Sequence, residues 1–256
     1  MGEIPNSMLF QSKADQYVLG RPGYPQEVFD LIASVVPPSE NIRIADIGSG
    51  TGIFSEELLK RNYETDCVEA SEAMRRKAEA GLCRYGGFHS VGAPAEDTGL
   101  PDNSLDLITV ASAFHWFNTP KFLAECRRIL KKDGWVFIVT NARPYDDEFT
   151  KAHHEICRRF CPSFTGVNHG AEYVESVLPD FFTAGYTKKI IPHDLVYTNE
   201  QFLSRCISSS FSPNPGDAGY PAYCDELKEL TSRFSADGKI LVHNQTVVWF
   251  GRIRRS

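Results

Sequence analysis

The sequence lacks the features of several common protein classes. No apolar run approaches the roughly 20 residues that a membrane-spanning helix needs, and the first residues contain no apolar core of a secretory signal. The patterns C-x-x-C, H-E-x-x-H and G-x-S-x-G are absent, and these mark common zinc sites and the nucleophile turn of α/β-hydrolases. We therefore expect no metal site and no membrane association.

Positive charge is also scarce. The 256 residues include 27 Lys and Arg against 33 Asp and Glu, which gives a net charge of -6 and a pI of about 5.7. A nucleic-acid-binding protein usually presents a basic face, so we expect no nucleic-acid partner. The seven cysteines are odd in number and scattered, which predicts free thiols in a reducing compartment and a cytoplasmic location.

Short apolar runs alternate with helical patterns in the first part of the chain. Strands are predicted at residues 42–47, 65–70, 88–91, 105–111 and 135–140, with helices at 54–61, 71–81 and 119–131. Further on, helices are predicted at 147–160, 199–208 and 221–234, and strands at 188–196 and 241–253. This alternation indicates an α/β fold, a doubly wound and mostly parallel sheet of seven strands with helices on both faces.

The strongest local signal is a glycine-rich stretch directly after the first predicted strand. Residues 45–52 read A-D-I-G-S-G-T-G, and glycines there allow a tight turn and a close approach of the backbone to a ligand. The following helix presents unpaired amide groups to an anion such as a carboxylate. The spacing G-x-G-x-G differs from the dinucleotide pattern G-x-G-x-x-G, because Ile53 occupies the third glycine position, and this disfavours NAD.

An acidic residue ends the second predicted strand. Glu69 follows Gly52 by 17 positions, and a carboxylate at this place can accept hydrogen bonds from both hydroxyls of a ribose. The glycine loop and Glu69 together predict a nucleoside site at the carboxyl edge of the sheet.

The combined pattern resembles the class I S-adenosylmethionine-dependent methyltransferases, specifically the type 11 family, over residues 14–142. The matching stretches are the first motif from Asp46, the segment G-A-P-A-E-D at residues 92–97 with L-P-D at 100–102, S-L-D-L-I at 104–108, and R-I-L-K-K-D-G at 128–134. The resemblance implies S-adenosylmethionine as cofactor. It implies a cofactor site made of Asp46, Gly48, Gly50, Gly52, Glu69, Ala70, Ala95, Glu96 and Ala111.

Two further stretches look like trans-aconitate methyltransferase-like proteins. One is the N-terminal segment with A-D-Q-Y at residues 14–17 and R-P-G-Y-P at 21–25, and the other is H-W-F at 115–117. By this resemblance, Tyr17 and Trp116 border the cofactor, and Arg21 and Tyr24 position the acceptor. His115 is the candidate base, although it could instead be a structural histidine, just as Trp116 could be a core residue.

These observations predict a single domain with four parts. Residues 1–40 form an N-terminal lid and first helix, 41–142 the cofactor-binding core, 143–182 a helical cap inserted over the cleft, and 183–256 the C-terminal completion of the sheet with helices. We expect in-line methyl transfer to a small-molecule acceptor by a monomer or homodimer. Carboxylate, hydroxyl, amine and carbon acceptors all stay open, as do a non-catalytic binding module and, with less support, a dinucleotide-dependent oxidoreductase.

Overall fold

Seven strands form one sheet in the computed structural model, which describes residues 23–166 and 168–254. In spatial order they are β3 (Phe88–Val91), β2 (Glu64–Val68), β1 (Arg43–Ile47), β4 (Leu105–Ala111), β5 (Leu130–Ala142), β9 (Gln245–Arg252) and β6 (Tyr186–Pro192). The strands from β3 to β5 are mutually parallel, and β9 runs antiparallel to both β5 and β6. The predicted α/β fold with a mostly parallel sheet of seven strands is confirmed.

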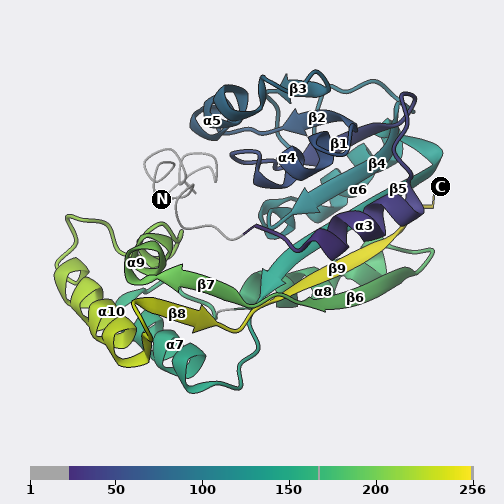
Figure 1. Cartoon of the computed structure of the whole chain (residues 1–256). Coiled ribbons are helices and arrows are strands. Elements are labelled where there is room, and N and C mark those ends of the chain that lie inside the picture. The colour runs from purple at the N-terminus through teal and green to yellow at the C-terminus, as the bar shows by residue number, and fades with distance from the viewer. Residues whose placement is uncertain (1–22, 167, 255–256) are drawn as a thin grey trace.

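Helices cover both faces of this sheet (Figure 1). One face packs against α6 (Thr119–Ile129) and α8 (His169–Phe181). The other packs against α3 (Gln26–Val35) and α4 (Ile53–Leu59), with α5 (Glu72–Leu82) beside α4. A strand that is covered on both sides is apolar on both sides, which explains the nearly continuous apolar run predicted as a strand at residues 135–140.

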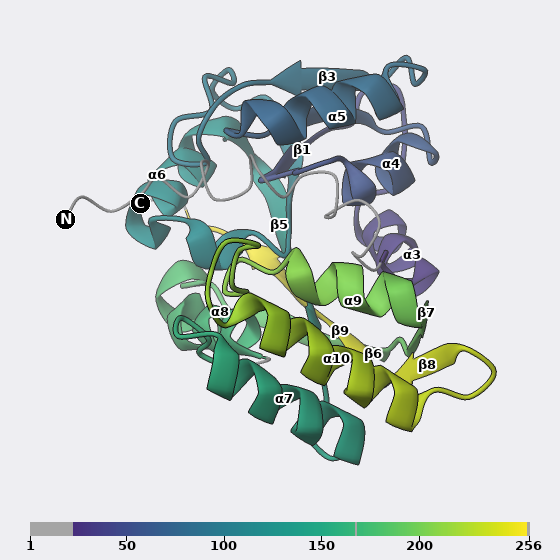
Figure 2. The same cartoon turned by 90° about the vertical axis from the view of Figure 1, so that its left-hand side faces the viewer.

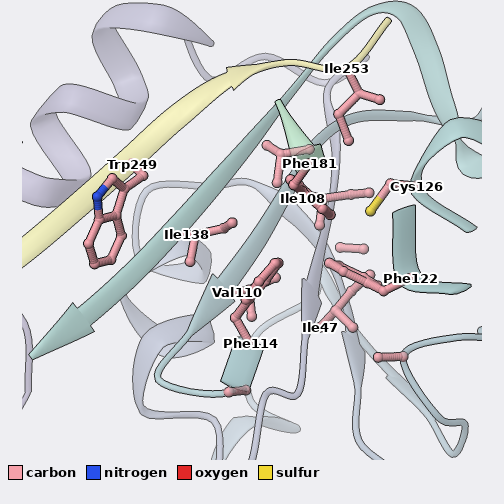
Figure 3. Packing of buried hydrophobic residues seen from close by; sticks show 14 of the residues in the cluster. Ile47, Ile108, Val110, Phe114, Phe122, Cys126, Ile138, Phe181, Trp249 and Ile253 are labelled. Atoms are coloured by element: carbon pink, nitrogen blue, oxygen red, sulfur yellow. The ribbon is translucent and has the colours of Figure 1, made fainter. Parts of the chain in front are cut away.

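The core under α6 and α8 is built from large, fully buried side chains (Figure 3). Phe122 of α6 and Phe181 of α8 pack with Ile108 and Ile138 of the sheet and with Trp249 of β9. Burying a side chain of this kind stabilises the fold by about 1.5–3 kcal/mol. The buried core thus holds the strands in place, and the strands position the loops at their carboxyl ends.

A second lobe, which we call the cap, has a core of its own. It contains α7 (Glu148–Phe160), α9 (Asn199–Ile207), α10 (Tyr220–Phe234) and a two-stranded ribbon of β7 (Leu195–Thr198) and β8 (Lys239–Val242). Figures 1 and 2 show these helices grouped on the side of the sheet to which β4 and β5 point.

The cap differs from the predicted segment, residues 143–182. Helix α8 lies within that segment but packs on the sheet through Val174, Leu178 and Phe181. Residues 195–242, predicted to complete the sheet, instead supply most of the cap core. The difference arises because the apolar side of α8 is complementary to the sheet, and its sequence pattern alone does not identify its partner.

Two predicted strands are each divided in two. Residues 188–196 divide into β6 and β7, and residues 241–253 divide into β8 and β9. At the break, the N–H of His193 donates to the Asn244 carbonyl (2.9 Å), and the N–H of Asn244 donates to the Asp194 carboxylate (3.3 Å). The chain passes here from the main sheet into the cap. The predicted strands each run through a polar pair at this junction, His193 with Asp194 and His243 with Asn244.

Candidate functional site

Three glycines form the loop between β1 and α4. Gly48 has a φ of +71° and Gly50 a φ of +58°, a region that L side chains rarely adopt. A Cβ on Gly48 would lie 2.6 Å from the Ala113 Cβ, whereas a Cβ on Gly50 would meet nothing within 4 Å. Gly48 is therefore required by packing as well as by conformation, and Gly50 presents bare backbone to open space.

The carboxylate of Glu69 is held directly against this loop. It accepts hydrogen bonds from the Gly50 N–H (2.9 Å) and the Ser71 N–H (2.7 Å). Burial raises the pKa of Glu69 above its usual value, and these two hydrogen bonds offset part of the rise. Each carboxylate oxygen retains acceptor capacity beyond one bond, so the group can still bind ligand hydroxyls.

Asp46 lies beneath the loop with its side chain directed inward. Its carboxylate accepts hydrogen bonds from Ser55 Oγ (2.5 Å) and Thr109 Oγ1 (2.9 Å) and is fully buried. Burial raises the pKa of Asp46 to about 6, against the hydrogen bonds from Ser55 and Thr109, which lower it. The side chain thus links β1 to α4 and β4, and its influence on the site comes through the loop that it supports.

A cavity of about 620 Å³ opens beside the glycine loop and extends to the cap. Of the predicted site residues, its walls include Tyr24, Gly48, Gly50, Ala111, His115 and Trp116. The cap side is formed by the α7–α8 connection and by the end of α9 with the residues after it. The cavity therefore joins the carboxyl edge of the sheet, where open α/β folds bind ligands, to a separately folded lobe.

Tyr24 and Ser112 form one wall of the cavity. The Tyr24 hydroxyl donates to Ser112 Oγ (3.0 Å), and its ring meets Phe54 edge-on at 5.1 Å. Ser112, which directly follows β4, has a φ of +54°. Residues held in such a conformation tend to cluster at functional sites, and this one lies where a ligand would contact it.

His115 and Trp116 lie in a short turn of 3-10 helix, residues Phe114–Trp116. Their rings are 4.8 Å apart, and Gly170 at the start of α8 approaches His115 so closely that a Cβ there would lie 3.2 Å from its Nδ1. Trp116 is part of the cavity wall and not of the core. The imidazole is thus held between the sheet loop and α8 at the edge of the cavity.

The remaining predicted contacts lie outside the cavity walls. Ala95 is buried in the core, and the Glu96 carboxylate accepts from the Asn118 N–H (2.6 Å). A Cβ on Gly52 would lie 2.5 Å from Leu82 Cδ1, and Ala70 is exposed beside Glu69. Tyr17 and Arg21 lie outside the described residues.

Sequence reasoning missed the polar residues on the far side of the cavity. These are Asn141, Arg143, Ser163, Asn168, Arg205, Ser209 and Ser210. Asn141 and Arg143 have a positional signal, because they lie at the carboxyl end of β5. The others come from the α7–α8 connection and from α9 with the residues after it, which carry no motif. Among the residues that the structure describes, no three His, Cys, Asp or Glu side chains are placed to hold a metal ion, and no helix is long and apolar enough to cross a membrane.

Comparison with known proteins agrees with this architecture. Residues 45–138 match the family described as methyltransferase domain. An uncharacterized methyltransferase of Mycobacterium tuberculosis is 31% identical over 137 residues, which are 54% of this chain and 54% of the relative. This chain therefore spans about half the length of that relative.

Two further comparisons cover more of the matched protein. A demethylmenaquinone methyltransferase of Thermotoga maritima is 30% identical over 167 residues, 62% of this chain and 69% of the relative. The structure of a candidate type II methyltransferase from Anaeromyxobacter dehalogenans superimposes with a TM-score of 0.68 at 25% identity, over 92% of this chain and 99% of that one. With its fold, glycine loop and acidic residue after β2, the chain belongs to the class I S-adenosylmethionine-dependent methyltransferases.

Proposed function

We propose that this protein binds S-adenosylmethionine and transfers its methyl group to a small-molecule acceptor in the cavity. The observation that carries the proposal is the hydrogen bond that joins the Gly50 N–H to the Glu69 carboxylate at 2.9 Å. It brings a bare backbone loop and an acceptor of ribose hydroxyls together beside a cavity of about 620 Å³. A sulfonium nucleoside has an amino-acid end and a sugar end that need these two kinds of contact.

The chain offers a suitable group for each part of the cofactor. Gly48 and Gly50 would hold the amino-acid end and Glu69 the ribose. By the resemblance, Ala95 and Glu96 would lie at the adenine, and Ala70 beside Glu69 would contact the cofactor. The aromatic faces of Tyr24 and Trp116 line the same cavity and would attract the positive sulfur.

When bound, S-adenosylmethionine supplies an electrophilic methyl group on a sulfur that leaves readily. The protein then has to hold the acceptor opposite that sulfur and exclude water. A carboxylate acceptor needs no base, whereas a hydroxyl or ammonium acceptor must lose a proton, which His115 in the cavity wall would accept. We assign acceptor positioning to Tyr24, and to Arg21 on the basis of the resemblance.

Calorimetric titration with S-adenosylhomocysteine and with NAD tests this proposal, followed by methyl-transfer assays on carboxylates, alcohols and amines. We expect binding of S-adenosylhomocysteine, no binding of NAD, and transfer to at least one acceptor class. Binding of NAD alone would indicate an oxidoreductase. Cofactor binding without transfer to any acceptor would favour a non-catalytic module.

A further inference from the structure

A buried guanidinium lies where β5 enters the cap. Arg143 is 5% exposed and lines the cavity. Its backbone is fixed by Asn168, whose side chain accepts from the Arg143 N–H and donates to the Arg143 carbonyl, both at 2.7 Å. Among the described residues, no carboxylate lies within 4.0 Å of this guanidinium. Most of the other described arginines do form an ion pair with a carboxylate.

The polar partner of Arg143 is an uncharged histidine. Arg143 Nη1 lies 3.2 Å from His153 Nδ1, and His153 Nε2 lies 3.3 Å from the Cys206 sulfur and 3.5 Å from the Cys157 sulfur. Burial, followed by the charge of Arg143, lowers the pKa of His153 well below its usual value. The imidazole is therefore neutral, with Nδ1 accepting from Arg143, and it orients the guanidinium without balancing its charge.

A second arginine lines the same cavity from α9. Arg205, the chain neighbour of Cys206, lines the cavity, and its Cζ lies 5.7 Å from the Tyr197 ring centroid. Its Nε is buried without a hydrogen-bond partner. Within residues 23–166 and 168–254, no carboxylate pairs with Arg205, so two arginines without a carboxylate partner in the described chain line one cavity.

The rest of the cavity wall favours an anion as well. None of the described residues that line it is Asp or Glu, although acidic residues outnumber basic ones in the whole chain. Ser163 and Ser210 line it with hydroxyl groups. Burying an unpaired charge carries a cost of several kcal/mol, and an arginine fork matches the two oxygens of a carboxylate or phosphate.

We infer that Arg143 and Arg205 form a subsite for an anionic oxygen group, a carboxylate or a phosphate, of the methyl acceptor. This inference rests on the proposed function, because it assigns the cap side of the same cavity to the acceptor. Arg143 directly follows β5 and Arg205 lies in α9 of the cap, whereas the glycine loop follows β1, which β4 separates from β5. The subsite is thus distinct from the place of the cofactor's own carboxylate, and it leaves the opposite end of the acceptor directed toward the sulfur.

Titration of the full chain saturated with S-adenosylhomocysteine tests the subsite. The probes are succinate with its neutral partner succinamide, and glycerol 3-phosphate with glycerol. We expect at least one anionic probe to bind at least tenfold more tightly than its neutral partner, and the pair that shows the preference distinguishes carboxylate from phosphate. Arg143→Met and Arg205→Met should each weaken that binding at least tenfold. Arg233→Met, at an exposed arginine of α10, should not change it.

The cofactor serves as the internal reference. Each variant should bind S-adenosylhomocysteine within twofold of the wild type, which also shows that it is folded. If Arg143→Met does not fold, Arg143→Lys is tested in its place. It keeps the positive charge but loses the forked guanidinium, and it should weaken binding of the anionic probe at least threefold. Equal binding of charged and neutral probes, or variants that bind the anion like the wild type, would overturn the subsite. An equal loss of cofactor affinity would assign the guanidiniums to the cofactor. A wild type that fails to bind S-adenosylhomocysteine at all would instead remove the proposed function itself.

Discussion

Gly50 and Glu69, which are 19 residues apart in the chain, are joined by a 2.9 Å hydrogen bond from the glycine N–H to the carboxylate. The bond links the loop after β1 to the end of β2. The glycine loop and the strand-end carboxylate therefore form one structural unit. A substitution in either of them should alter the position of the other.

Replacement of Glu69 should weaken cofactor binding without unfolding the protein. Glu69→Ala removes the acceptor of the ribose hydroxyls, and we expect a loss of about 1–3 kcal/mol in the binding of S-adenosylhomocysteine. Glu69→Gln keeps one acceptor oxygen and should lose less. Calorimetry measures both, and affinities equal to the wild type would refute the ribose assignment.

The glycine loop should tolerate substitution unequally. Gly50→Ala meets no neighbour but still requires a positive φ, so we expect a destabilisation of about 1–2 kcal/mol. Gly48→Ala adds a clash with Ala113 and should destabilise the protein further.

Gly81 in α5 provides the matched control. It has open space and no positive φ, so Gly81→Ala should stabilise the protein by about 0.5–1 kcal/mol. Urea unfolding of the three variants gives the order. A Gly48→Ala variant as stable as Gly50→Ala would contradict the packing at the loop.

Asp46 should make the stability depend on pH. Its pKa in the folded protein is about 6, above the ordinary 3.8, so between these values the folded state binds more protons than the unfolded state. The free energy of unfolding therefore falls as the pH rises through this range, by about 3 kcal/mol.

In Asp46→Asn this fall should be absent. Measured from pH 4 to pH 7, the stability of the variant relative to the wild type should rise by about the same amount. Asp30→Asn, at an aspartate whose side chain is 73% exposed, should follow the wild type. Parallel curves for Asp46→Asn and the wild type would show that burial does not perturb this carboxyl.

The role of His115 depends on the acceptor. If the acceptor is a hydroxyl or an ammonium group, His115→Gln should lower kcat about 10²-fold or more, because the proton then has no acceptor. If it is a carboxylate, kcat should change little. Unchanged turnover of a hydroxyl or amine acceptor would remove the histidine as base and leave the fold assignment intact.

The sequence predicts the half of the site that repeats a local pattern. Residues 45–52 and Glu69 were identified because a glycine loop and a strand-end carboxylate have fixed spacing in the chain. Strands β1, β4 and β5 can be predicted because burial on both faces produces apolar runs.

The cap half of the site could not be predicted in this way. Arg143 and Arg205 are 62 positions apart, and the contacts of His153 with both Arg143 and Cys206 bring their segments together. Helix α8 and the junction at Asp194 and Asn244 likewise depend on tertiary partners. Such contacts leave no periodic trace in the sequence.

The most direct test of the whole account is a crystal structure of the full chain with S-adenosylhomocysteine. We predict the ribose hydroxyls within hydrogen-bonding distance of Glu69, the amino-acid end against Gly48 and Gly50, and the sulfur facing the cavity that leads to the cap. An empty groove at Gly50 and Glu69, or a nucleoside bound elsewhere, would contradict the account.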